Sequence, residues 1–343
     1  MAKLITGGLG FIGINLAHAL LKKNEEVVLF DVVTKSPLLH DVDIKDRVKI
    51  IQGDLASWAE VLEVVKDHNI DGIYHTGALL SASAEEKPIT AYHVNAGGTF
   101  NILEAARLFN VKRVIYLSTI ATYGLGIPET VNEETIQMPI SMYGVTKVFS
   151  ERLGEYYFRK FGVDFRGLRF PSVIGPGRGP GGASAYSTLI IQDPALGKPY
   201  QCFVDEEARI PILYIKDAVD SLIALYGADN KKLKRRVYNI AGFSPSAREL
   251  AEEVKKYIPK AVIEFKPDPQ MVEVVHSWPK YVDEKKAHEE WGWKTKEKLG
   301  SDLIIEIPPI SFFNGDLKSS LQMSIFKSDP MSCKELADHV HHI

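Results

Sequence analysis

A tyrosine and a lysine four residues apart form the pair in this sequence with the clearest chemical potential. Tyr143 and Lys147 occur in S-M-Y-G-V-T-K, and on a helix this spacing places both side chains on one face. A lysine ammonium beside a phenol favours the phenolate, so the pair predicts a lowered tyrosine pKa. A tyrosine that accepts a proton near neutral pH suits the oxidation of an alcohol by hydride transfer. The same spacing also arises in helices without catalytic roles. The other segments of the chain must therefore show whether this pair is catalytic.

A glycine-rich turn near the N-terminus predicts a nucleotide-binding site. The segment T-G-G-L-G-F-I-G lies between a short apolar strand and a helical pattern. In this context Gly7 permits a tight turn, Gly10 lets the backbone approach a pyrophosphate, and Gly13 lets the helix pack closely. The helix that begins near Phe11 and Ile12 would present free amide groups to the phosphates.

An acidic residue ends the second predicted strand. The strand E-V-V-L-F is followed by Asp31, whose carboxylate can accept hydrogen bonds from both ribose hydroxyls of a dinucleotide and repel a 2′-phosphate. No arginine follows Asp31 immediately. These features favour NAD over NADP as the cofactor.

Strands and helices alternate through the first half of the chain. This alternation predicts an α/β fold of the Rossmann type, with a doubly wound parallel sheet. Ligands bind such sheets beyond the carboxyl ends of the strands. The chemically informative residues fall at these ends, which favours a functional interpretation. They are Asp31, Asp54, Gly77, Ala78, Ser118, Thr119 and Phe170.

Composition excludes several classes of function. The 343 residues are 45% hydrophobic and 25% charged, as in an ordinary globular protein. A formal net charge of −3 gives no electrostatic basis for binding nucleic acid or an anionic membrane. No apolar run approaches the roughly 20 residues of a membrane span. Cys202 and Cys333 lack metal or redox spacing and no signal peptide precedes the first strand, so we expect a cytoplasmic protein without a metal site.

These motifs resemble those of the extended short-chain dehydrogenase/reductases, the NAD-dependent epimerase/dehydratase family. The similarity rests on the glycine-rich turn, G-D-L, H-T-G-A, V-N-A-G-G-T, L-S-T-I-A-T-Y-G and Y-x-x-x-K, all within about residues 1–175. The resemblance implies that Tyr143 acts as base or acid and that Lys147 binds the nicotinamide ribose and tunes the tyrosine. It implies that Thr119, with Ser118 beside it, hydrogen-bonds the reacting oxygen.

The resemblance also implies a cofactor site and an assembly state. A homodimer would form through the long helices near 89–110 and 143–161. The implied cofactor-binding residues are Gly7, Gly10, Phe11, Ile12, Gly13, Asp31, Asp54, Leu55, Gly77, Ala78, Asn95, Tyr143, Lys147 and Phe170.

The second half of the chain is similar to one branch of that family, the UDP-galactose-4-epimerase-like L-threonine dehydrogenases. The similar segments include H-S-W-P-K-Y-V-D, W-G-W, Y-N-I-A-G-F-S and I-P-I-L-Y-I-K-D-A. This resemblance implies oxidation of L-threonine to 2-amino-3-ketobutyrate, with reduction of NAD. The substrate-binding residues it implies are Ser81, Thr119, Tyr143, Gly182, Ala183, Ser184 and Trp278.

The loop at 182–186 departs from that branch. Its members carry G-T-T-D-Y where this chain has G-A-S-A-Y, so an aspartate that could bind a substrate ammonium group is missing. The preceding V-I-G-P-G resembles the N-V-Y-G-P-G of nucleotide-sugar epimerases and dehydratases. The alternative function is therefore a 4-epimerase or dehydratase of the UDP-glucose/galactose type that retains its NAD. The small-molecule substrate is an amino acid or a nucleotide sugar.

The two predicted domains are interleaved along the chain. We expect an NAD-binding Rossmann domain at 1–170 plus about 212–240, because strand-like segments return there. A smaller α/β substrate lobe would comprise about 171–211 plus 241–303. Residues 304–343 form a C-terminal tail with no assigned role.

Overall fold

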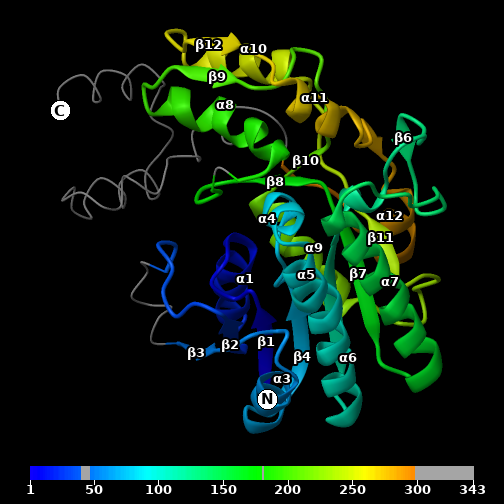
Figure 1. Ribbon diagram of the computed structural model, residues 1–343. Coiled ribbons are helices and arrows are strands. Elements are labelled where there is room, and N and C mark those ends of the chain that lie inside the picture. Colours follow the sequence, from blue (N-terminus) through cyan, green and yellow to red (C-terminus); the bar gives the residue numbers. More distant parts are fainter. Residues whose placement is uncertain (40–46, 180, 298–343) are drawn as a thin grey trace.

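A parallel seven-stranded sheet forms the centre of the molecule, in the order β11-β7-β5-β4-β1-β2-β3 (Figure 1). The computed structural model describes residues 1–39, 47–179 and 181–297. All neighbouring strands run parallel, so each connection crosses over the sheet. This confirms the predicted α/β fold of the Rossmann type. The strands are β1 (Ala2–Thr6), β2 (Glu26–Asp31), β3 (Val48–Gln52), β4 (Ile70–His75), β5 (Arg113–Thr119), β7 (Phe165–Phe170) and β11 (Val237–Asn239).

Helices cover both faces of this sheet (Figure 1). Successive strand residues point to opposite faces, so Ile5 joins one buried cluster and Leu4 the other. Helices α1 and α9 pack together on the first face, and α3, α6 and α7 on the second. The bounds are α1 (Phe11–Lys22), α3 (Trp58–Asp67), α6 (Gly98–Leu108), α7 (Met142–Phe161) and α9 (Ile215–Gly227). Between β4 and α6 lie α4 (Ser81–Glu86), α5 (Pro88–Ala91) and a π-helix (Tyr92–Gly97).

The remaining elements form a smaller lobe above the carboxyl ends of the sheet (Figure 1). Three two-stranded parallel sheets belong to it or border it. They pair β8 (Ser172–Ile174) with β10 (Ile212–Tyr214), β9 (Tyr200–Cys202) with β12 (Ile263–Phe265), and β6 (Thr130–Val131) with β13 (Tyr281–Val282). The helices are α8 (Tyr186–Ala195), α10 (Ala247–Tyr257), α11 (Pro269–His276) and α12 (Lys285–Trp291).

The chain returns to the large sheet after entering the smaller lobe. β11 pairs with β7 at the sheet edge, and α9 covers the sheet. β10, which lies in the same predicted return segment, pairs with β8 instead. The domain bounds near 170, 212 and 240 therefore stay a proposal. Residues 298–303 of the predicted substrate lobe and the 304–343 tail lie outside the described residues.

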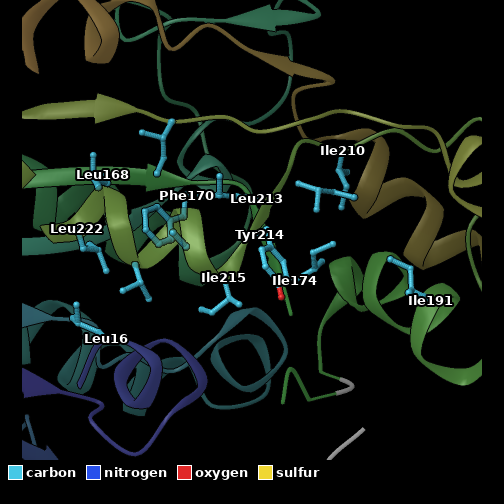
Figure 2. Close-up of a cluster of buried hydrophobic side chains, with 14 of the residues drawn as sticks. Leu16, Leu168, Phe170, Ile174, Ile191, Ile210, Leu213, Tyr214, Ile215 and Leu222 are labelled. Atoms are coloured by element: carbon cyan, nitrogen blue, oxygen red, sulfur yellow. The ribbon is translucent and has the colours of Figure 1, made fainter. Parts of the chain in front are cut away.

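One hydrophobic cluster extends from the sheet into the smaller lobe. Figure 2 shows Leu168 and Phe170 of β7 in the same cluster as Ile191 of α8 and Ile210. Both lobes contribute side chains to this cluster. Their packing therefore fixes the position of the smaller lobe relative to the strand ends. Within the described segments, every helix is too short or too polar to cross a lipid bilayer.

Candidate active site

The strand ends that the sequence singles out lie along one edge of the sheet. Thr6 of β1 pairs with His75 of β4, and Thr119 of β5 pairs with Phe170 of β7. The parallel register therefore brings the glycine-rich turn, the 76–79 turn and the Ser118–Thr119 segment to the same edge. This edge is where ligands bind in open α/β sheets.

The glycine-rich turn forms a close-packed cradle. Gly7 has φ 61°, and a Cβ there would lie 2.6 Å from the Cα of Gly77. A Cβ at Gly13 would lie 2.4 Å from the oxygen of Gly7, so only glycine lets α1 approach this closely. Gly10 is exposed and precedes α1 without a side-chain cap, which leaves the first amide groups of the helix available. Phe11 and Ile12 follow in that first turn, both partly buried.

Asp31 lies beside this cradle at the end of β2. Its Oδ2 accepts a 3.0 Å hydrogen bond from the Leu9 amide, and its Oδ1 accepts a 3.3 Å bond from the Val33 amide. The carboxylate is partly exposed, so its remaining lone pairs can reach a ribose. The cradle, the uncapped helix end and this acid together fit an adenine dinucleotide.

The other predicted cofactor residues complete the surroundings of the cradle. Asp54 follows β3, and its Oδ1 accepts a 2.9 Å bond from the Ala56 amide. Leu55 is buried against the backbone at Gly77, and Ala78 is partly buried in the same turn. Phe170 turns its ring into the hydrophobic cluster (Figure 2).

Asn95 supports the cradle from inside the protein. Its side chain is buried, accepts a 2.8 Å bond from the Leu79 amide and donates to the Leu79 oxygen at 3.0 Å. It also donates to the Thr146 hydroxyl at 3.1 Å. The amide of Asn95 is thus occupied by protein groups, and it positions the turn that follows β4.

Tyr143, Lys147 and Thr119 meet where α7 crosses the end of β5. The Ser141 hydroxyl accepts a 3.1 Å bond from the Gly144 amide, which caps α7 and places Tyr143 in its first turn. The Lys147 ammonium nitrogen lies 5.5 Å from the centre of the Tyr143 ring. Thr119 hydrogen-bonds with the Tyr143 side chain. The predicted spacing therefore does place both side chains on one helix face, next to the strand-end threonine.

The pKa of Tyr143 differs in direction from the expectation. Burial raises it to about 12, against the opposing effects of the Thr119 hydrogen bond and the positive charge of Arg178. Burial also lowers the pKa of Lys147 to about 7, opposed by the Glu151 carboxylate. The sequence showed the spacing of the pair but not how completely α7 and β5 enclose it. For both groups, desolvation of the charged form outweighs the neighbours that stabilise it.

Ser118 faces inward and makes a different contact from its neighbour. It is buried, and its hydroxyl donates a 2.5 Å hydrogen bond to Glu151 Oε1. Arg169 donates to both oxygens of Glu151, with Nη2 to Oε2 at 2.8 Å. In this structure the hydroxyl predicted to lie near the reacting oxygen is held by a buried acid instead.

The sequence pattern did not single out this buried network or the cation Arg178. Glu151 lies four residues after Lys147 on α7, so the helical spacing that paired Tyr143 with Lys147 also points to it. Arg169 extends the network to the Tyr123 hydroxyl at 2.9 Å. Arg178, in the loop after β8, acts on Tyr143 by charge. The glycine- and proline-rich setting of Arg178 gave no periodic signal that could have placed it there.

His75 is a structural residue of this edge. Its Nδ1 lies 2.7 Å from the Thr6 hydroxyl and its Nε2 lies 3.0 Å from the Thr99 hydroxyl. Burial, and then the charge of Lys147, lowers its pKa to about 3. The ring is therefore neutral near pH 7 and has no free nitrogen for proton transfer.

The remaining predicted substrate residues come from three segments of the chain. Ser81 is the first residue of α4 and is partly buried. Gly182 (φ 86°) opens a 3-10 turn in which the Ala183 side chain is buried and Ser184 is partly exposed. Trp278 is partly buried and packs against the main hydrophobic cluster. Within the described segments no group of acidic, histidine or cysteine side chains is arranged to hold a metal ion.

The fold and these side chains define an α/β enzyme that uses a nicotinamide cofactor. The chain belongs to the NAD-dependent epimerase/dehydratase family, whose model matches residues 3–241.

Several named proteins are similar to this chain over most of its length. A mitochondrial L-threonine 3-dehydrogenase from Bos taurus is 34% identical over 295 residues, which cover 85% of this chain and 78% of that protein. A GalE-like L-threonine dehydrogenase from Cupriavidus necator in its holo form superposes with a TM-score of 0.83 at 31% identity, covering 89% of this chain and 98% of that one. A nucleoside-diphosphate-sugar epimerase from Agrobacterium tumefaciens superposes with a TM-score of 0.78 at 26% identity, covering 89% and 92% of the two chains.

Proposed function

We propose that this protein oxidises a secondary alcohol by hydride transfer to NAD, with Tyr143 as the general base. The observation that carries the proposal is the meeting of Tyr143, Thr119 and Lys147 at the strand edge that also holds the glycine cradle. Bound NAD would supply the hydride acceptor, and Asp31 with the cradle would hold it.

Each side chain has a separate role in this proposal. Tyr143 takes the hydroxyl proton, and Thr119 holds the same oxygen and orients the carbon that loses the hydride. The pKa of Tyr143, about 12, means that the phenol needs positive charge beside it to ionise near neutral pH. Lys147 and Arg178 are the cations close to it.

L-Threonine is the substrate that the comparisons favour, with 2-amino-3-ketobutyrate as the product. Relatives named as L-threonine dehydrogenases cover most of this chain at 31% to 34% identity. The direct test is NADH formation when purified protein is mixed with L-threonine and NAD. Absence of NADH at saturating threonine and NAD would refute this substrate.

The altered 182–186 loop supports a second candidate, a nucleotide-sugar 4-epimerase or dehydratase that retains its NAD. The Ala183 and Ala185 side chains are buried there, where the threonine dehydrogenase branch carries threonine and aspartate. The test is conversion of UDP-glucose to UDP-galactose without added NAD. Net NADH release from threonine would favour the first candidate, and sugar conversion with retained cofactor the second.

We also propose a cytoplasmic homodimer that forms through α5, α6 and α7. Large apolar side chains are exposed on these elements and the π-helix between them, an arrangement typical of a surface covered by a partner. They include Ile89 (75% exposed), Tyr92 (55%), Phe100 (45%) and Phe149 (47%). Light scattering should give a dimer mass for the wild type and a monomer mass for Phe149→Glu. A monomeric wild type would refute the assembly.

A further inference from the structure

Arg178 is a cation near the proposed site that has no acidic partner among the residues that the structure describes. Its guanidinium donates to the backbone oxygens of Gly179 and Gly181 at 3.3 and 3.4 Å, both long hydrogen bonds. None of the ion pairs formed within residues 1–39, 47–179 and 181–297 involves it. The side chain is only partly exposed, so its charge is partly desolvated without compensation from a carboxylate.

The loop that carries Arg178 lies against the proposed cofactor site. A Cβ at Gly175 would lie 3.4 Å from the Phe11 ring, at the start of α1. A Cβ at Gly177 would lie 2.5 Å from the Leu38 side chain, in the segment after β2. The loop thus runs from the glycine cradle toward the 182–186 turn, and Arg178 sits on it.

Arg178 also interacts electrostatically with the proposed catalytic tyrosine. Burial raises the pKa of Tyr143, and the guanidinium charge of Arg178 opposes this rise. Burial lowers the pKa of Arg178, and its interaction with Tyr143 opposes this fall. No carboxylate in the described part of the chain contributes to the pKa of either group. The nearest acid on α7, Glu151, is held by Ser118 and Arg169.

The charge balance of this space favours an anion. Position 185 is a buried alanine, so the turn at 183–185 offers no carboxylate to neutralise Arg178 or to attract a substrate ammonium group. A planar guanidinium with free donors matches the geometry of a carboxylate or phosphate.

We propose that Arg178 binds an anionic group of the substrate while Tyr143 receives the proton of its hydroxyl. The inference rests on the proposed function and specifies the substrate as an alcohol that carries a carboxylate or a phosphate. The carboxylate would be that of an amino or hydroxy acid, and the phosphate that of a nucleotide sugar.

The test measures binding to the NAD-loaded full-length protein by isothermal titration. Two matched pairs of ligands serve as probes: L-threonine against its isostere L-threoninamide, in which an amide replaces the carboxylate, and UDP against uridine. For at least one pair the wild type should bind the member that carries the carboxylate or phosphate more tightly. Arg178→Gln should weaken binding of that member about 30-fold or more and should not weaken binding of its counterpart.

Three controls separate binding from folding and from the cofactor. Arg178→Lys keeps the charge but loses the planar fork, so its affinity should fall between those of the wild type and Arg178→Gln. Arg248→Gln changes an arginine whose side chain is 53% exposed in ion pairs with Glu206 and Glu207, and it should match the wild type. The Kd for NAD should be the same in all variants.

The outcomes distinguish this proposal from the proposed function. The proposal is overturned if Arg178→Gln binds both L-threonine and UDP as the wild type does, or if it weakens NAD binding instead. It is also overturned if the wild type binds neither L-threonine nor UDP more tightly than the counterpart that lacks the anionic group. If UDP binding depends on Arg178 but threonine is neither bound nor oxidised, Arg178 binds the anionic group as proposed. In that case L-threonine is not the substrate. If threonine is oxidised and Arg178→Gln changes nothing, only the role of Arg178 fails.

Discussion

The Lys147 ammonium donates a 2.6 Å hydrogen bond to the backbone oxygen of Leu117, two residues before Thr119. This bond ties the first turns of α7 to the end of β5. Tyr143 lies on α7 and Thr119 lies on β5. The bond therefore fixes the position of the proposed base relative to the threonine that would hydrogen-bond the reacting oxygen. Lys147 therefore has a positioning role in addition to its charge.

Substitution of Lys147 should change how stability depends on pH. Its pKa is about 7 in the folded protein and about 10.4 in an unfolded chain, so the unfolded state binds more protons between these values. The free energy of unfolding should therefore rise with pH across this window and receive no such contribution below it. Urea unfolding at pH 7 and pH 9 should show this rise in the wild type and a smaller rise in Lys147→Met.

The exposed Lys256, paired with Glu253 on α10, provides a control for that measurement. Lys256→Met should keep the pH dependence of the wild type. An identical rise in Lys147→Met and the wild type would show that Lys147 keeps an ordinary pKa in the fold.

Removal of the Glu151 carboxylate should destabilise the protein strongly. Glu151 and Arg169 are both buried, so Glu151→Gln leaves the arginine without its partner, at a cost of about 3–5 kcal/mol. Urea unfolding measures this loss. Glu155→Gln is the matched control, because its partner Arg152 is half exposed, and it should cost no more than about 1 kcal/mol. Equal stability of the two variants would contradict the importance of the buried pair.

Substitutions of the neighbours Ser118 and Thr119 should have different effects. A change at Ser118 should mainly reduce stability, and a change at Thr119 should mainly reduce kcat. Ser118→Ala removes a donor to the buried Glu151, so it should cost about 1–3 kcal/mol of stability. Thr119→Val keeps the shape of the side chain but removes the hydroxyl beside Tyr143, so it should lower kcat about 100-fold. The lost cap to the Ala121 amide should cost about 1 kcal/mol of stability. Steady-state kinetics and urea unfolding of both variants test this division. If Ser118→Ala mainly lowered kcat and Thr119→Val mainly lowered stability, Ser118 would be the catalytic hydroxyl and Thr119 the structural one.

A methyl group at Gly13 should weaken cofactor binding. Its Cβ would lie 2.4 Å from the Gly7 oxygen, which forces the cradle and α1 apart. The Kd for NAD, measured by titration, should rise about tenfold or more for Gly13→Ala. A Cβ at Gly227 on α9 would have no neighbour within 4 Å, so Gly227→Ala should bind NAD as the wild type does. Unchanged affinity in Gly13→Ala would place the dinucleotide elsewhere.

The sequence predicted the parts of this fold that depend on local pattern. Alternating strands and helices, the glycine spacing and Asp31 follow from short segments, and they predicted the sheet and the cradle. The pairing of β10 with β8 depends on tertiary packing, and no local pattern showed it. The same limit explains the inward turn of Ser118 and the raised pKa of Tyr143, because both follow from burial between α7 and β5.

The proposed reaction requires that Tyr143 accept the proton of the alcohol. The decisive measurement is kcat/KM for L-threonine oxidation in the wild type and Tyr143→Phe, with the Kd for NAD and the urea midpoint measured on both proteins. We expect a loss of about 10²–10⁴ in kcat/KM for Tyr143→Phe, with NAD binding and stability unchanged. Turnover by Tyr143→Phe equal to that of the wild type would refute this role of Tyr143.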